Sequence, residues 1–542
     1  MRWCAKVING LSLVLCLFDD ISSAIQVQQD PLERSLITSY EKRGVLRILW
    51  TLSICLISVV LTAQYPNILV TEHPGSCEPS IAMDPLDTDR LVAGTILDRV
   101  AYSVDGGATW IDGRLESSYG VWGDPVIDID EQGNFYYFHL SNPQDGHWID
   151  RIVCQRSEDG GKTWTSGSFA GLNAEKQQDK HWSVVDRKNG IIYLTWTEFD
   201  EYGSKNSSCY SRIRFSKSVD RGETWSPAVT ISDAEGDCID DDETTEGAVP
   251  AIGPDGQIYV CWADRNGLNF TRSEDGGESW MKPVVIDPMP GGWSFDIPGI
   301  YRCNGMPITL CDVSGGNHHG TVYVNWSDQR NGEEDTDVWL ISSKDGGMSW
   351  SDPVRVNDDP PGKHQFFTWM TIDQTDGTLY GVFYDRRRYE DDRTDVFLVA
   401  SHDGGLTFQN QRISENSFVP SKEVFFGDYN DISAHGGQVR PIWTSMEDGK
   451  TSVWTALVEW NKDLTDDAVQ LDLEFELSRR GKVCLEVIDP SGDEQRLFRQ
   501  RMSSGEHRYT YIWPNEEWKK GTYRFRLRSR KNTIWSTEKI IR

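Results

Sequence analysis

The chain has 542 residues, of which 38% are hydrophobic, and it contains 22 Trp, 19 Tyr, 19 Phe and 48 Gly. This length suffices for two or three domains, and the many aromatic and glycine residues favour short strands joined by tight turns. The formal net charge of −30 argues against a nucleic-acid partner, because binding to phosphates requires a basic surface.

An apolar stretch comes first in chain order, at residues 45–62, and Lys42 and Arg43 precede it. We predict a signal peptide at about residues 43–63, with cleavage between Ala63 and Gln64, and therefore a secreted or cell-surface protein. The alternative is a membrane anchor, because about 18 apolar residues are just enough to span a bilayer. Residues 1–42 match neither a signal nor a domain, and we attribute them to a misassigned start codon.

Eight cysteines follow the predicted cleavage position, and export permits disulfides. The closest loop pairs are Cys303 with Cys311 and Cys209 with Cys238, and the connectivity stays open at this point. No Cys-x-x-Cys pair occurs, so nothing in the sequence supports a zinc or redox site.

The pattern S-x-D-x-G-x-[TS]-[WF] occurs six times, with 54 to 70 residues between successive starts. Six copies indicate a repeated architecture. A short Asp side chain accepts hydrogen bonds from nearby backbone amides, and Gly supplies a positive φ angle. We therefore predict that each copy is a hairpin turn held by a structural aspartate, namely Asp105, Asp159, Asp220, Asp275, Asp345 and Asp403.

This repeat resembles the Asp-box, or BNR repeat, of the sialidase-like β-propellers, over roughly residues 66–460. The resemblance implies an all-β fold, with the propeller at residues 64–463. The motif is more specific for the fold than for the activity.

The segments between the boxes predict how many blades the propeller has. Seven first strands are expected, but there are only six boxes, and the segment Gly427–Trp460 has three strands and no box. Tyr65–Thr71 would supply the missing strand and close the ring, which removes an exposed sheet edge. We therefore predict seven blades, with the six blades of the familiar sialidase propeller as the alternative.

Strand direction decides which loops meet over the central channel. The boxes and the first hairpins lie on one face, so the other face collects the loops that enter each first strand and the loops that follow each second strand. These loops carry carboxylates, arginines and aromatic residues. Trp122, His181 and Trp182 are the candidate rim residues that would bind a sugar.

The resemblance also implies a catalytic scheme. Sialidases bind the carboxylate of sialic acid with three arginines and use a Tyr nucleophile, a helper Glu and an acid/base Asp, which is an exception to the two-carboxylate scheme of glycosidases. By predicted face and residue type, the candidates here are Arg265, Arg330 and Arg387 for substrate binding, Tyr429 as nucleophile, Glu246 as helper, and Asp124 or Asp179 as acid. The alternative for Arg265 and Arg330 is a structural clamp, in which Asp and Arg pair between neighbouring blades.

Two features bear on these assignments. Glu78 lies in the first blade where a sialidase has its first arginine, so this chain departs from the family pattern. The acidic run Asp237–Glu246 has oxygen ligands that suit calcium but lacks the spacing of an EF-hand, and a solvated loop is the alternative. We predict no cofactor and no metal.

The boxes stop after Trp460, and five alternating strands are predicted between Val469 and Arg542. Residues 464–542 therefore form a small antiparallel β-sandwich. Its order of motifs resembles the C-terminal sorting domain of the type IX secretion system of Bacteroidota, which implies contact with outer-membrane secretion machinery. An ordinary accessory sandwich is the alternative.

The sequence leaves two functions open. The first is an exported glycoside hydrolase that acts on terminal sugars of glycans, of the exo-α-sialidase type that the resemblance implies. The second is a non-catalytic propeller that binds a glycan or a protein at the cell surface. We expect a monomer in either case.

Overall fold

The computed structural model describes residues 65–460 and, beyond them, the six strands between Val469 and Ile541. The chain divides into two units, Met1–Gln64 and Tyr65–Arg542. The predicted signal peptide lies outside the described residues. No helix among the described residues has the length and apolar character to cross a membrane.

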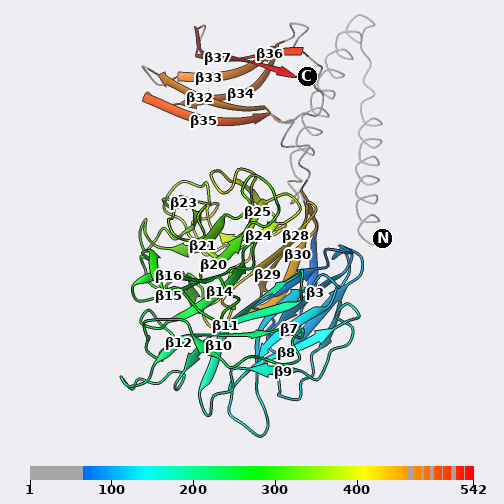
Figure 1. Cartoon of the computed structure of the whole chain (residues 1–542). Helices are drawn as coiled ribbons and strands as arrows, with labels where there is room; N and C mark the ends of the chain where they lie inside the picture. The colour runs from blue at the N-terminus through cyan, green and yellow to red at the C-terminus, as the bar shows by residue number, and fades with distance from the viewer. Residues whose placement is uncertain are drawn as a thin grey trace, which may run out of the picture. The chain divides into compact units, whose positions relative to one another are not determined.

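The first half of the propeller contains three sheets, each built from four consecutive antiparallel strands (Figure 1). The first sheet comprises β2 (Ser80–Met83), β3 (Leu91–Thr95), β4 (Arg99–Ser103) and β5 (Ile111–Arg114). The second comprises β6 (Gly123–Ile129), β7 (Phe135–Leu140), β8 (Ile152–Ser157) and β9 (Ser168–Ala170). The third comprises β10 (Gln177–Asp186), β11 (Ile191–Phe199), β12 (Ser211–Ser218) and β13 (Val229–Thr230).

Three further sheets repeat the same order. The fourth comprises β14 (Glu246–Ile252), β15 (Ile258–Asp264), β16 (Gly267–Ser273) and β17 (Val284–Asp287). The hairpin of β18 (Ser294–Phe295) and β19 (Cys303–Asn304) follows it. The fifth comprises β20 (Ile308–Cys311), β21 (Val322–Asp328), β22 (Asp337–Ser343) and β23 (Val354–Arg355), and the sixth comprises β24 (Gln365–Asp373), β25 (Thr378–Asp385), β26 (Asp395–Ser401) and β27 (Gln409–Arg412).

The seventh sheet joins the two ends of the propeller. It contains β28 (Asp431–His435), β29 (Gln438–Glu447), β30 (Lys450–Ala456) and the short β31 (Val458–Glu459), and β1 (Asn67–Thr71) pairs antiparallel with β30. The innermost strands β2, β6, β10, β14, β20, β24 and β28 contact one another in sequence around a ring. The prediction of an all-β propeller with seven blades, closed by the N-terminal strand, is confirmed.

Large aromatic residues fill the space between neighbouring blades. Trp196, Trp262 and Trp326 lie two or three residues before the ends of the second strands of three successive blades, and all three are fully buried. Because the second strands lie in the middle of each sheet, both of their faces are covered and their sequences are almost continuously apolar. These packed interfaces hold the loops of the channel face in fixed positions.

Each of the six boxes forms the same turn. In the first box, Asp105 accepts hydrogen bonds from the backbone nitrogen of Thr109 at 2.8 Å and from its hydroxyl at 2.6 Å. Ser103 accepts a bond from the Gly107 nitrogen and donates one to Asp105. The same pattern recurs in the other five boxes, where the aspartate is Asp159, Asp220, Asp275, Asp345 or Asp403. In these positions the six carboxylates stabilise turns.

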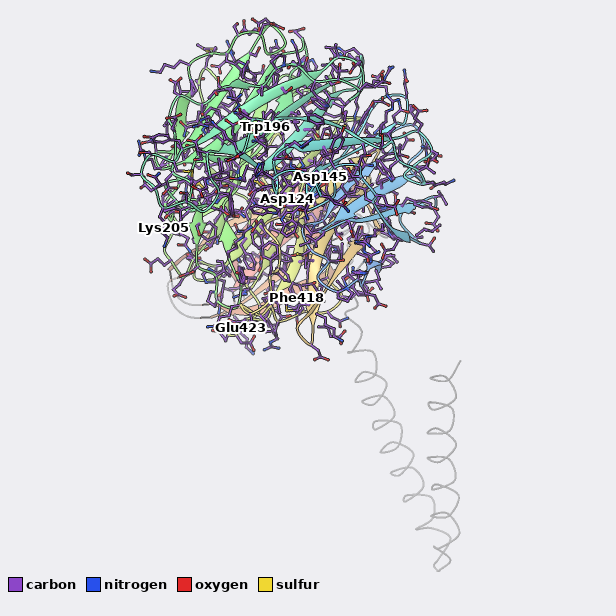
Figure 2. All side chains as sticks on the ribbon, turned by 90° about the horizontal axis from the view of Figure 1, so that it is seen from below. Asp124, Asp145, Trp196, Lys205, Phe418 and Glu423 are labelled. Carbon is purple, nitrogen blue, oxygen red and sulfur yellow. A yellow bond between two sulfur atoms is a disulfide. The ribbon has the colours of Figure 1, made fainter. Side chains whose placement is uncertain are left out.

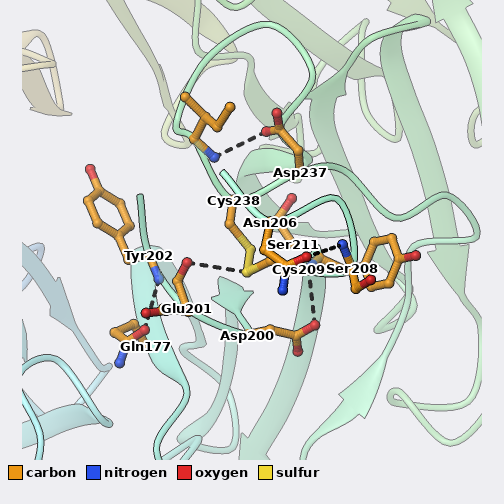
Figure 3. Close-up of a disulfide and its surroundings, with 12 residues drawn as sticks. Gln177, Asp200, Glu201, Tyr202, Asn206, Ser208, Cys209, Ser211, Asp237 and Cys238 are labelled. Carbon is orange, nitrogen blue, oxygen red and sulfur yellow. Dashed lines mark hydrogen bonds between the residues drawn. A yellow bond between two sulfur atoms is a disulfide. The ribbon is translucent and has the colours of Figure 1, made fainter. Parts of the chain in front are cut away.

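A disulfide joins Cys209 and Cys238, with 5.9 Å between their Cα atoms (Figure 3). It connects the loop before β12 to the acidic segment before β14. Cys303 and Cys311, the other close pair in the sequence, are both free and buried.

The C-terminal strands form two antiparallel sheets. One pairs β32 (Val469–Leu477) with β35 (Gly505–Trp513). The other orders β34 (Glu494–Met502), β33 (Gly481–Ile488), β36 (Gly521–Ser529) and β37 (Asn532–Ile541). Strand β32 contacts β37 of the second sheet, so the two sheets pack as a small sandwich.

Candidate functional site

The innermost strands of four blades carry a β-bulge close to their first residues. The bulges lie in β6, β10, β14 and β24, and within each one a residue has a positive φ angle: Asp124 (51°), Lys180 (47°), Gly247 (76°) and Phe367 (49°). Non-glycine residues rarely adopt this conformation, and such strain is typical of functional sites. A bulge also changes the direction of side chains along a strand.

The side chains at these bulges meet others from the loops of the same face. We call the resulting group the channel cluster, and Figure 2 shows its member Asp124 near the middle of the ring of blades. The cluster contains six carboxyl groups and two cations, connected by short contacts or by direct electrostatic interaction: Glu78, Asp124, Asp179, Asp240, Glu246 and Asp428, with Lys180 and Arg302.

Asp428 is the central anion of the cluster. Its Oδ2 atom lies 2.7 Å from Lys180 Nζ, and its Oδ1 accepts a hydrogen bond from Arg302 Nε at 2.8 Å. Asn304 donates to its backbone oxygen at 3.0 Å. Burial by itself would raise the pKa of Asp428, but Arg302 and Lys180 hold it well below the usual value. Asp428 is therefore ionised.

A second anion, Asp240, lies on the other side of Arg302. The Asp240 Oδ2 atom is 3.2 Å from Arg302 Nη1 and accepts a hydrogen bond from the Tyr202 hydroxyl at 2.5 Å. The fully buried Glu246 is next to Asp240. Burial and then Asp240 raise the pKa of Glu246 well above its usual value.

Two further acids also have raised pKa values. Burial raises the pKa of Asp179 to about 7, although Lys180 opposes the shift. Burial and then Asp124 raise the pKa of Glu78 well above its usual value. The cluster therefore combines carboxyl groups whose pKa is raised with a carboxylate, Asp428, whose pKa is lowered, which is the combination that acid–base catalysis needs.

Tyr429 lies under the cluster in an aromatic layer. Its ring contacts Trp182 edge to face, with 5.0 Å between centroids, and Trp182 contacts Trp369 at 4.3 Å. The Tyr429 hydroxyl donates a hydrogen bond to the Pro125 oxygen at 3.4 Å. Burial and the nearby Glu78 raise the pKa of Tyr429 well above its usual value. In this state the phenol is a poor nucleophile.

His181 is buried beside the same layer. Burial lowers its pKa to about 3, so the imidazole is neutral, and neither ring nitrogen has a hydrogen-bond partner. The predicted substrate-binding residues His181 and Trp182 therefore lie beneath the channel cluster and not at its surface.

An aromatic rim leads from solvent to the cluster. Trp122 is 38% exposed and packs edge to face against Trp148 at 5.6 Å, and Trp148 contacts Tyr202 at 5.7 Å. Since Tyr202 also binds Asp240, the rim is continuous with the charged groups. Arg302, whose side chain is 37% exposed, lies over the Phe425 ring on another part of the rim.

A cavity of about 840 Å³ adjoins the loop that supplies Arg302. Its walls come from residues 291–300, from residues 329–334 after β21, and from His364 and Lys422 before two innermost strands. A volume of this size is typical of small-molecule sites. A gap too narrow for a water molecule lies at the cluster and is lined by residues that include Asp428 and Tyr429.

The three predicted arginines are not brought together. Arg330 pairs with Asp328 at 2.7 Å and packs on Trp339, and Arg387 pairs with Asp385 and packs on Phe397. Both also pair with an aspartate of the preceding blade, Arg330 with Asp287 and Arg387 with Asp358, as the structural clamp between neighbouring blades predicts for Arg330. Arg265 is exposed and lies 3.7 Å from Glu243. The arginine cluster that a sialidase needs is therefore absent from these positions.

The aspartates of the acidic run have partners within the protein. Asp237 accepts a hydrogen bond from Thr244, Asp242 accepts one from the Ser294 nitrogen, and Asp240 binds Arg302. No cluster of His, Cys, Asp or Glu with the geometry of a metal site is found between residues 65 and 460 or in the described strands after them.

The structure brings together four predicted catalytic residues: Asp124, Asp179, Glu246 and Tyr429. Sequence reasoning missed the cations that organise them. Lys180 directly follows Asp179 in the sequence, but nothing there distinguished it from the other charged residues of these loops. Arg302 lies in the insertion between the fourth and fifth blades, where no repeat marks it.

Several solved structures are similar to the chain at low identity. The Hadza microbial sialidase Hz136 has 16% identity and a TM-score of 0.39, with 68% of this chain and 73% of that protein covered. The α-L-arabinofuranosidase Arb93A of Fusarium graminearum has 12% identity and a TM-score of 0.41, covering 73% and 98%. A protein of unknown function from Dyadobacter fermentans has 11% identity and a TM-score of 0.42, covering 74% and 100%.

No protein-family model matches the chain, and no curated protein matches it. The likeness to the solved structures does not transfer an activity or a substrate. The chemistry of the channel cluster is the basis for a function.

Proposed function

We propose that this chain is a glycoside hydrolase that acts on terminal sugars of glycans. The observation that carries the proposal is that one cluster holds both Asp179, whose pKa burial raises to about 7, and the more accessible carboxylate Asp124. Glycoside hydrolysis needs a protonated carboxyl group at the leaving oxygen and an ionised carboxylate that acts as base or nucleophile. The exposed Trp122 and the nearby cavity supply a place for a sugar.

Asp179 is the proton donor in this proposal. It is neutral below about pH 7, and Lys180, directly beside it, stabilises the carboxylate that remains after proton transfer. The second group is Asp124, because it is the most accessible carboxylate of the cluster for which a contact with Lys180 is found, at 3.7 Å. Asp428 fixes Lys180 and Arg302 and thereby positions both acids.

The finer activity, exo-α-sialidase, is implied by the Asp-box resemblance. In that form Tyr429 would be the nucleophile, and Glu78, not Glu246, is the first carboxylate that acts on its pKa. The phenol would have to lose its proton to a neighbouring carboxylate before it could attack.

The test is hydrolysis of a panel of aryl glycosides, including an aryl α-sialoside, by the purified full-length chain and two variants. Asp179→Asn is expected to lower kcat by about 10²–10⁴-fold on any substrate that is turned over, since general acid catalysis contributes this much. Tyr429→Phe is expected to retain activity in the two-carboxylate scheme and to lose it in the sialidase scheme. Full activity in Asp179→Asn would remove Asp179 from the mechanism.

A non-catalytic propeller that binds glycans is the second candidate. The observation in its favour is the extent of burial, since Glu246, Lys180 and Asp428 are almost inaccessible and Lys180 and Asp428 pair with each other. Binding of a glycan without turnover, and with no effect of Asp179→Asn, would establish this candidate instead.

We also propose that the chain acts outside the cell, secreted or at the surface, as a monomer. The predicted signal peptide, the resemblance of residues 464–542 to sorting domains, and the Cys209–Cys238 disulfide support this location, because disulfides persist in oxidising compartments. The proposed partners are a glycan or glycoprotein and the outer-membrane secretion machinery.

A further inference from the structure

We infer that the terminal sugar taken by this site carries no acid group, and is an uncharged or positively charged sugar instead of a sialic acid. The inference rests on the proposed function, because it names the substrate class of the same site. It follows from the balance of charge in the channel cluster, from the partners of its two cations, and from carboxylate oxygens that have no donor.

The cluster has six carboxyl groups against two cations. The carboxyl groups therefore outnumber the cations three to one. A bound carboxylate would add a further acidic group to this set. Like charges placed close together in a partly buried site are strongly unfavourable.

Neither cation is free to bind an acidic ligand. Arg302 uses Nε and Nη2 on Asp428 and Nη1 on Asp240, so all three of its nitrogens already have carboxylate partners. Lys180 lies within 4 Å of two carboxylates, those of Asp428 at 2.7 Å and Asp124 at 3.7 Å. A sialic acid would have to displace Asp428 or Asp240 to obtain the two parallel hydrogen bonds that a guanidinium gives a carboxylate.

The cluster contains buried carboxyl oxygens that have no hydrogen-bond partner within the protein. They are Asp124 Oδ2, Glu78 Oε1 and both side-chain oxygens of the fully buried Glu246. Sugar hydroxyl and ammonium groups donate hydrogen bonds, whereas a carboxylate only accepts them. Buried acceptors without a partner therefore favour a ligand that brings donors.

The walls of the adjoining cavity also carry more acidic than basic side chains. Asp296, Glu333 and Glu334 line it, against a single basic side chain, Lys422. His364 also lines it, but burial lowers the pKa of His364, so the imidazole adds no positive charge near neutral pH. The wall of this cavity, two residues before Arg302 in the chain, therefore carries more acidic than basic side chains and disfavours anions.

The experiment compares matched glycans that differ only by the terminal sialic acid. Binding of the full-length chain to sialylated and enzymatically desialylated glycoprotein glycans is measured by calorimetry, and hydrolysis is followed on the same pairs and on neutral and amino-sugar aryl glycosides. We expect the desialylated glycans to bind at least about tenfold more tightly. We also expect Asp240→Asn to reduce this preference, because it releases Arg302 from one partner, whereas Asp391→Asn at a remote exposed pair leaves it unchanged.

The outcomes separate the inference from the proposed function. Preference for the desialylated glycan with turnover supports both. The same preference in binding without turnover supports the inference and overturns the hydrolase. Tighter binding or faster turnover of the sialylated glycan overturns the inference and leaves the hydrolase standing where turnover is seen. Failure to bind either glycan overturns both.

Discussion

Single residues of the channel cluster differ in protonation although they are the same chemical group. Asp428 is ionised because two cations contact it, whereas Asp179 is neutral up to about pH 7 because burial outweighs the effect of Lys180. These opposite shifts assign the roles of acid and anion. Changes of pH and of charge are therefore expected to act on the protein through these individual residues.

The pKa of Asp179 predicts the alkaline limb of the activity. The pKa is raised in the folded chain, so the acid form is present below about pH 7 and is lost as the pH rises through that value. We expect kcat/KM to fall tenfold per pH unit above this point and the limb to disappear in Asp179→Asn. A pH–rate profile of both proteins checks this, and a limb that persists in the variant would assign it to another group.

The pair of Lys180 and Asp428 predicts a large effect on stability. Both side chains are almost fully buried, 2.7 Å apart, so Lys180→Met leaves Asp428 with Arg302 as its remaining cation partner. We expect the free energy of unfolding to fall by about 3–5 kcal/mol, as for other broken buried pairs. Urea unfolding measures it, with Arg393→Met at an exposed pair as the control that should change little. Equal effects of the two substitutions would refute a special role for the buried pair.

At the scale of elements, four blades have a box turn on one face of the propeller and a β-bulge on the other. The box turns between third and fourth strands use Asp side chains to bind their own backbone, as Asp403 does with the Thr407 nitrogen at 3.0 Å. The bulges at the start of the innermost strands, on the opposite face, turn Asp124 and Lys180 toward the cluster. Most residues of these innermost strands therefore pack in the core, whereas the first residues contribute side chains to the channel cluster.

The loop that carries Asp240 depends on the Cys209–Cys238 disulfide. One residue separates Cys238 from Asp240, and the Gly203 nitrogen, next to Tyr202, donates to the Cys238 oxygen at 2.6 Å. We expect the double variant Cys209→Ser with Cys238→Ser to lose about 2–4 kcal/mol of stability. KM should rise more than kcat falls, because Asp240 and Tyr202 would no longer be fixed.

Thermal unfolding and steady-state kinetics test this expectation. Dithiothreitol should reproduce the effect in the parent chain and add nothing in the double variant. A parent chain whose KM is indifferent to reduction would show that the disulfide does not position the site.

At the scale of the whole molecule, ring closure sets the position of every loop on the channel face. The seventh blade takes β1 from the other end of the propeller, and Val70 of β1 is buried in a core with residues of the first blade. Closure removes the free edges of the sheets at the two ends of the ring. The cluster depends on this, since Asp428 and Glu78 come from the blades on either side of the junction.

Val70→Asp is predicted to open the ring. It places a carboxylate in an apolar core, so we expect a clear fall in melting temperature and concentration-dependent aggregation through the exposed edge of β30. Leu69→Asp is the matched control, because Leu69 is the neighbouring residue on the exposed side of the same strand. Calorimetry and light scattering measure both, and a stable monomeric Val70→Asp variant would contradict the closure argument.

The sequence by itself determined the architecture, because the signals for it are local. Each box is completed by hydrogen bonds that span four residues, such as that from Thr109 to Asp105, so six copies could be counted without a structure. The surplus of first strands over boxes then predicted the seventh blade and its closure by β1.

Only the tertiary structure decided the site. Arg302 is 126 residues from Asp428, and Lys180 is 248 residues from it, yet all three meet over the channel. Residue type and predicted face brought Asp124, Asp179, Glu246 and Tyr429 to the correct region. They could not show which cations would reach it, because contact between distant blades depends on how the ring closes. Protonation was decided there as well, because the shifts in pKa arise from burial and from neighbours that the linear order does not reveal.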